Sequence, residues 1–302
     1  MAGFFGLFDY TKPGKGVEAD KPKKHPFFLF WELVWRKLGR LITLNLMYFI
    51  VILPLIAVAY LMMYEQILTF FPAFAEEEGF FSLLPSLLFS ATSVLLETSP
   101  WLAYLLVAAS VVLYGPATCG LTYVLRNYAQ EEHAWISDFW DRTKKNFRQG
   151  FFLGLVDIVV VSLLVYNITF SFGALSETPM MSVIQTLSLV LLALYFFMRH
   201  YTYLMAVTFE LSIFGILKNA WIFSVVAFWK NVLVTAVILL LLLVIFLTHP
   251  LVEFALLPLI FFSFCGFLAV FICYPVLQRH MIDGPSAQEE EKEALPEEEQ
   301  VQ

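Results

Sequence analysis

The chain has 302 residues, of which 60% are apolar and only 14% are charged. Soluble domains carry about 25% charged residues, so this composition excludes an ordinary soluble domain and indicates an integral membrane protein. The net charge of −7 does not indicate a surface that binds cations, because eight of the acidic residues lie within residues 283–302. We predict that this segment is a disordered acidic cytoplasmic tail.

The N-terminal segment has two parts. Residues 1–26 contain five lysines between Lys12 and Lys24 and are predicted to be a cytoplasmic arm. Residues 27–40 combine aromatic side chains with Arg36, Lys37 and Arg40. This combination is typical of an amphipathic helix that lies at a membrane surface.

Six apolar segments follow, each near the length that crosses a hydrocarbon core of ~30 Å. They are predicted to be helices, because backbone polar groups in lipid must find hydrogen-bond partners within their own segment. The fold class is therefore all-α, a polytopic membrane helical bundle, with residues 27–282 as one membrane domain. The predicted spans are about residues 41–62, 101–126, 151–172, 182–198, 231–248 and 254–277.

The basic residues predict the orientation of this bundle. None of the 18 Lys and Arg residues lies in residues 63–100, 173–183 or 249–253. Cytoplasmic loops concentrate Lys and Arg, so these three segments are predicted to lie outside. Both termini are then cytoplasmic.

Residues 80–96 are apolar enough to imitate a seventh span. Pro85 and several Ser and Thr residues interrupt the segment, and a crossing here would place the basic residues 142–148 outside. We predict instead an interfacial helix on the outer face. Its serines would form one polar stripe, made of Ser82, Ser86, Ser90 and Ser93.

Two inner segments, residues 127–150 and 200–230, mix aromatic and basic residues. Anionic lipid headgroups explain this mixture better than nucleic acid does. An aromatic-basic pattern also precedes each outgoing span, and two interpretations are open: generic anchoring at the headgroup level or a three-fold repeat of helical hairpins. The predicted headgroup contacts are Arg142, Lys144, Lys145 and Arg148.

The best intramembrane candidate for a functional residue is Asp157, because ionisable residues within spans usually have partners or a function. We predict an ion pair with Arg199, with Arg126 as the second candidate. The pair could be structural, or it could serve a proton or a substrate. Gly115-Pro116 is a candidate hinge, since proline within a span frees a backbone carbonyl.

No motif in the sequence indicates an enzyme. It contains no GxxxxGK[ST], HExxH or GxSxG pattern, and its histidines lack the spacing of metal ligands. The three cysteines all lie in predicted spans. We therefore predict no catalytic residue, no metal and no cofactor.

One stretch of the chain resembles a known family. Gly115-Pro116-Ala117 leads through Tyr123-Val124-Leu125-Arg126 to an aromatic loop. That loop ends in Asp138-Phe139-Trp140 and Lys144-Lys145-Asn146-Phe147-Arg148-Gln149. These motifs resemble the YesL-like family of bacterial integral membrane proteins, a domain-of-unknown-function family, and the similarity extends over about residues 1–282.

The resemblance implies a location in the plasma membrane of a Gram-positive bacterium. It also implies a link to carbohydrate metabolism, because genes of this family often accompany carbohydrate-uptake and polysaccharide-degradation systems. The expected function is a non-enzymatic accessory of solute uptake, with a permease complex as its protein partner. Two alternatives stay open: a small secondary permease that uses Asp157 and the proline-kinked spans, and a membrane scaffold without cargo.

Overall fold

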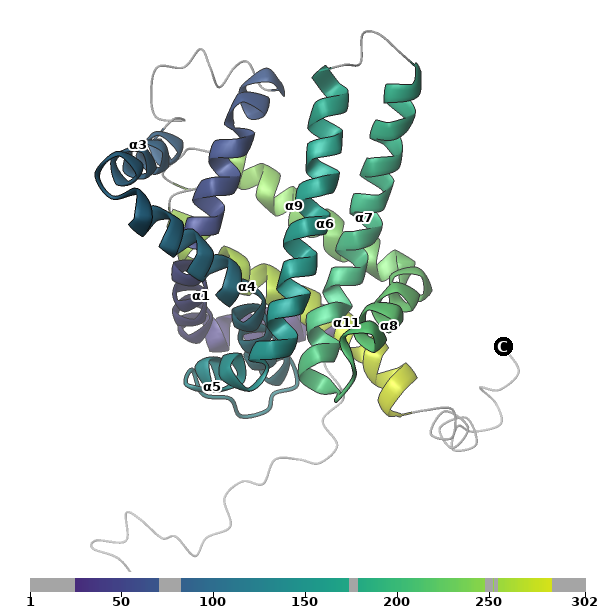
Figure 1. The fold of residues 1–302 in the computed structure, drawn as a ribbon. Coiled ribbons are helices and arrows are strands. Elements are labelled where there is room, and N and C mark those ends of the chain that lie inside the picture. The colour runs from purple at the N-terminus through teal and green to yellow at the C-terminus, as the bar shows by residue number, and fades with distance from the viewer. Residues whose placement is uncertain (1–24, 71–82, 174–178, 248–251, 253–254, 284–302) are drawn as a thin grey trace, which may run out of the picture.

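The computed structural model describes residues 25–70, 83–173, 179–247, 252 and 255–283. Every element in these residues is helical (Figure 1). The predictions for residues 1–24 and for the tail from residue 284 lie outside the described residues. The helices are α1 (Pro26–Phe70), α3 (Leu83–Thr98), α4 (Pro100–Ala129), α5 (Asp138–Lys145), α6 (Phe147–Gly173), α7 (Pro179–Thr208), α8 (Ile213–Val226), α9 (Phe228–Leu247) and α11 (Phe262–Leu277). Two π-helical turns, η3 (Leu257–Phe261) and η4 (Gln278–Ile282), flank α11.

Six helical segments of the described chain are long and apolar enough to cross a membrane, which confirms the predicted number of spans. Each overlaps one predicted span, and most extend beyond it. The fourth, for example, continues to Thr208, whereas the predicted span ended at residue 198. The six segments are Pro26–Ala59, Pro100–Ala129, Phe147–Phe170, Pro179–Thr208, Phe228–Ile245 and Leu257–Ile282.

Residues 27–40, predicted to be a surface helix before the first span, are helical but do not form an element of their own. These residues are the start of α1, a continuous helix of 45 residues that also contains Pro54. One face of this start is buried, and the Phe30 ring stacks on Phe267 of α11 at 5.5 Å between centroids. Packing against α11 therefore supports the helix, and no chain break is needed before the span begins.

The segment predicted as an outer interfacial helix is α3, with 16 residues. At 1.5 Å per residue it is about 24 Å long, and it is not among the six segments that could cross. It packs against α4 and α1, and in Figure 1 it lies beside the start of α4. The helix is confirmed, while its place at the outer surface stays a prediction. The side chains of Ser82, Ser86 and Ser93 lie outside the described residues, and Ser90 is exposed.

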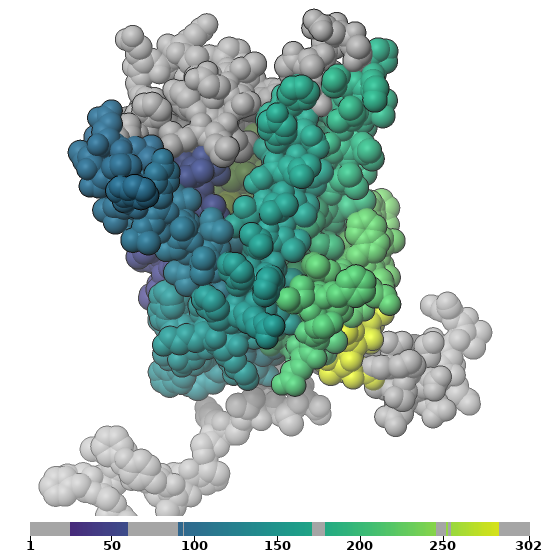
Figure 2. Space-filling view, in the orientation of Figure 1, coloured from purple at the N-terminus to yellow at the C-terminus, as the bar shows by residue number. Residues whose placement is uncertain are grey.

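Two short helices, α5 and α8, lie at the lower end of the bundle in Figures 1 and 2. They fall in the two segments predicted to lie on the inner surface. Helix α5 packs closely on α4, because a Cβ atom on Gly120 would lie 2.3 Å from Thr143 Oγ1. Ser212 is the N-cap of helix α8, because its hydroxyl accepts a hydrogen bond from Gly215 N.

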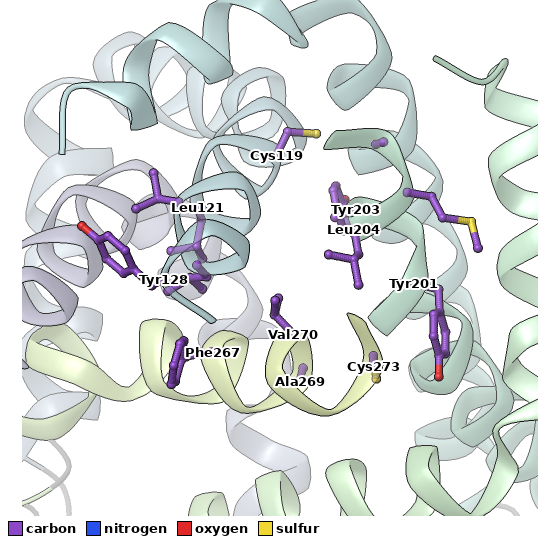
Figure 3. Close-up of a cluster of buried hydrophobic side chains, with 14 of the residues drawn as sticks. Cys119, Leu121, Tyr128, Tyr201, Tyr203, Leu204, Phe267, Ala269, Val270 and Cys273 are labelled. Atoms are coloured by element: carbon purple, nitrogen blue, oxygen red, sulfur yellow. The ribbon is translucent and has the colours of Figure 1, made fainter. Parts of the chain in front are cut away.

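The buried core joins α1, α4, α7 and α11, and Figure 3 shows part of it. Two fully buried asparagines form hydrogen bonds with backbone groups at junctions between helices. Asn45 Nδ2 donates to the carbonyls of Leu257 and Pro258 at 3.0 and 2.6 Å, and Asn45 Oδ1 accepts from Ser263 N at 2.8 Å. Asn45 thus pairs two carbonyls and one N–H group where η3 meets α11, and it fixes α1 to the start of α11.

The second asparagine, Asn231, lies in the first turn of α9, just after the end of α8. Its Nδ2 donates to the carbonyls of Phe223 and Ser224, each at 3.1 Å, and its Oδ1 accepts from the Tyr201 hydroxyl at 3.0 Å. Unpaired carbonyls at a helix end need such partners when they are buried. Asn231 therefore ties the junction between α8 and α9 to α7.

Candidate intramembrane polar site

Three glycines allow α4 and α6 to cross in direct backbone contact. A Cβ atom on Gly115 would lie 1.9 Å from the Gly150 carbonyl oxygen, and one on Gly154 would lie 2.7 Å from Gly115 Cα. Gly150 and Gly154 are four residues apart, the spacing at which small residues allow close packing of membrane helices. We did not predict this close crossing from the sequence, although the spacing of Gly150 and Gly154 is visible there.

The candidate hinge lies at this crossing. A Cβ atom on Gly150 would lie 2.8 Å from both Pro116 N and Pro116 Cα. Helix α4 continues through Pro116 without interruption. Gly115 and Pro116 therefore have a packing role, and hinge motion stays a prediction.

The crossing places Asp157 of α6 against α4 and α7. The Asp157 side chain is 4% exposed, and Arg199 Nε of α7 donates to its Oδ2 at 3.0 Å. The structure thus brings together the two residues predicted to pair. Arg126, the second candidate, lies elsewhere and donates to the Val207 carbonyl and the Thr208 hydroxyl near the end of α7.

Three tyrosine hydroxyls complete the coordination of the carboxylate. Tyr195 donates to Asp157 Oδ1, Tyr203 donates to Oδ2 at 2.6 Å, and Tyr114 donates to Oδ2 at 3.3 Å. Arg199 also donates to the Tyr114 hydroxyl at 2.7 Å. Four donors from α4 and α7 therefore satisfy one buried carboxylate, which offsets the cost of removing its charge from water.

We did not predict the tyrosines as partners of Asp157, although their spacing is visible in the sequence. Tyr195, Arg199 and Tyr203 recur every four residues, so they share one face of α7. Tyrosines in membrane proteins are commonly interfacial anchors, and this pattern alone does not distinguish an anchor from a partner of Asp157.

A second set of hydrogen bonds connects this cluster to α1. The hydroxyls of Tyr48 and Thr118 share a hydrogen bond of 3.0 Å, and Thr118 Oγ1 donates to the Tyr114 carbonyl at 2.7 Å. Ser110 Oγ of α4 donates to the Val51 carbonyl of α1 at 2.6 Å. The polar site thus connects α1, α4, α6 and α7 inside the bundle.

Polar side chains continue from this cluster along the inward face of α7. Gln185 and Ser188 are buried on this face. The Arg199 side chain is 31% exposed despite its ion pair. This face can exchange hydrogen bonds with water or with a hydroxyl-rich solute.

The residues predicted to contact lipid headgroups differ in their surroundings. Arg142 is half-buried: it donates to the Tyr123 hydroxyl at 2.8 Å, and its guanidinium lies 4.0 Å from the centre of that ring. The other three, Lys144, Lys145 and Arg148, are exposed. Arg142 therefore also has a structural role within the fold.

Metal ligands and reactive thiols are the other kinds of site to consider in the described residues. No three His, Cys, Asp or Glu residues of the described chain lie close enough together to hold a metal ion. Cys119, Cys265 and Cys273 are free and buried. The polar site around Asp157 is therefore the candidate that the fold offers.

Six long apolar helices, three of which meet at a buried ion pair, define a multi-pass helical membrane protein. Residues 87–168 match the family model described as "Protein of unknown function, DUF624", and the YesL-like proteins belong to that family. The match confirms the resemblance and includes α4, α5, most of α6 and Asp157. Neither the curated proteins nor the solved structures contain a match to this chain.

Proposed function

We propose that this protein is a non-enzymatic accessory of solute uptake in a bacterial plasma membrane. The observation that supports the proposal is the set of partners around Asp157, whose carboxylate accepts four hydrogen bonds from α4 and α7. A carboxylate that carries a proton or a cation through a transport cycle has to exchange its partners. One with four donors is better suited to hold three helices together. The link to carbohydrate comes from the resemblance to the YesL-like family.

The accessory is oriented with both termini in the cytoplasm. The distribution of Lys and Arg supports this orientation. Helices α5 and α8 lie at the same end of the bundle (Figure 1), and the exposed cations Lys144, Lys145, Arg148 and Lys218 lie on or beside them. That end would face the anionic lipids of the inner leaflet.

Affinity purification from native membranes in a mild detergent tests the accessory function. The tagged full-length protein should carry subunits of a solute permease with it, identified by mass spectrometry. A tagged, unrelated six-span protein from the same membranes is the control. Recovery of the tagged protein without any permease subunit would contradict the proposal.

A small permease is the second candidate, and the polar inward face of α7 favours it. Gln185, Ser188, Tyr195 and Arg199 would offer hydrogen bonds to a hydroxyl-rich solute along that face. Proteoliposomes that contain only this protein would then accumulate solute, and Asp157→Asn would abolish accumulation without unfolding the protein. Absence of both uptake and permease subunits would point to the third function, a scaffold without cargo.

A further inference from the structure

One buried hydroxyl in the described chain has no hydrogen-bond partner. It belongs to Tyr128, near the end of α4, whose side chain is fully buried. Figure 3 shows the Tyr128 ring directed from α4 toward α1. Buried polar atoms are nearly always paired, so this exception points to a missing acceptor.

Two cations of α1 surround this tyrosine. Lys37 Nζ lies 4.9 Å from the centre of the Tyr128 ring. The Arg40 guanidinium faces the hydroxyl without completing a hydrogen bond of normal geometry. Both side chains are half-buried. Neither forms an ion pair with a carboxylate of the described residues.

The carboxylates nearby already have donors. Glu131 accepts from Arg36 at 2.7 Å, and Asp138 accepts from Trp135 N at 2.9 Å. The cluster of Lys37, Arg40 and Tyr128 thus presents hydrogen-bond donors and positive charge, and its hydroxyl has no acceptor among the described residues. An anion with several oxygen atoms would supply that acceptor.

We propose that Lys37, Arg40 and Tyr128 bind the phosphate group of an anionic lipid headgroup between α1 and α4. Arg40 offers planar paired donors that match phosphate oxygens, and Lys37 adds a point charge. The two long side chains move apart to admit the phosphate, and the Tyr128 hydroxyl then donates to it.

The surroundings favour a lipid over a free phosphate ion. Trp31 and Trp35 are exposed on the same stretch of α1, and tryptophan side chains settle at the headgroup level of a membrane. Basic pockets between membrane helices commonly hold such headgroups. The site is separate from the exposed cations on and beside α5, and it does not depend on the accessory function.

Thermal unfolding of the full-length protein in detergent tests this site, with phosphatidylglycerol or phosphatidylcholine added. Phosphatidylglycerol should raise the wild-type Tm, and phosphatidylcholine should not. Arg40→Gln should lose more than half of that rise. Arg148→Gln is the matched control, because it removes the same charge from an exposed position and should keep the rise.

Tyr128→Phe is the sharper variant. It keeps the ring and its contact with Lys37 and removes only the unpaired hydroxyl. Its Tm without lipid should therefore match the wild type, while the rise caused by phosphatidylglycerol should shrink. If Arg40→Gln does not fold, Tyr128→Phe alone still tests the proposal.

Three outcomes would overturn the proposal. An equal loss in Arg40→Gln and Arg148→Gln would mean that net charge alone attracts the lipid. If phosphatidylglycerol raised the Tm of Tyr128→Phe as much as that of the wild type, the Tyr128 hydroxyl would have no part in binding the lipid. An equal rise with inorganic phosphate alone would assign the site to a free anion. Native mass spectrometry should agree, with fewer phosphatidylglycerol molecules retained by Arg40→Gln and Tyr128→Phe.

Discussion

Asp157 shows how one buried charge organises its neighbours. Its carboxylate is the only charged group among the buried side chains of the described residues, and its four donors come from two helices other than its own. Removing one partner of a buried ion pair costs about 3–5 kcal/mol, whereas neutralising the pair costs less. Substitutions on the two sides of the ion pair should therefore differ in their cost.

Arg199→Ala should lower stability more than Asp157→Asn. The alanine variant leaves a buried carboxylate with only hydroxyl donors, while the asparagine variant leaves a cation that is partly exposed and can be solvated. Tm values of both variants in detergent measure this. Equal losses would mean that the pair contributes nothing as a pair.

The tyrosines give a second prediction at the residue scale. Tyr203→Phe removes a 2.6 Å hydrogen bond to the carboxylate and should cost about 1.5–3 kcal/mol, the range for hydrogen bonds to charged groups. Tyr166→Phe is the matched control, because Tyr166 is exposed on α6, and it should leave Tm unchanged. If both variants have the same Tm in detergent, the Tyr203 hydroxyl does not contribute to stability.

At the scale of elements, the crossing of α4 and α6 depends on glycine. Gly154→Ala should destabilise the protein, because its Cβ would lie 2.7 Å from Gly115 Cα and the helices would have to separate. The separation would also lengthen the bond from Tyr114 to Asp157. Tm in detergent is the measurement.

Gly39→Ala provides the control for this change. Gly39 lies in α1 with no atom within 4 Å of a built Cβ, and replacing a helical glycine by alanine stabilises by about 0.5–1 kcal/mol. The two substitutions should thus shift Tm in opposite directions. A shift of the same sign in both would refute the close crossing.

The elements also show what the sequence could predict. Six spans followed from the length and apolar character of their segments, and the partnership of Asp157 with Arg199 followed from the cost of an isolated charge. The continuous α1 could not be predicted, because the burial of Phe30 against Phe267 depends on a contact between distant parts of the chain. The roles of Asn45 and Tyr114 could not be predicted for the same reason, because the sequence does not show which distant residue a polar side chain in a span will contact.

At the scale of the whole molecule, the central prediction is the orientation of the bundle. Single cysteines introduced at Glu77 or Glu177 should react with an impermeant thiol reagent in intact cells, and a cysteine at Glu132 should not. The reason is the absence of Lys and Arg from the segments around Glu77 and Glu177. Glu132 is exposed between α4 and α5, so it should react once the cells are permeabilised.

The native cysteines allow this experiment in the natural background. Cys119, Cys265 and Cys273 are buried, so the protein without added cysteines should give little signal in either condition. Labelling at Glu132 in intact cells would reverse the orientation. It would place α5, α8 and the cluster of Lys37, Arg40 and Tyr128 at the outer leaflet.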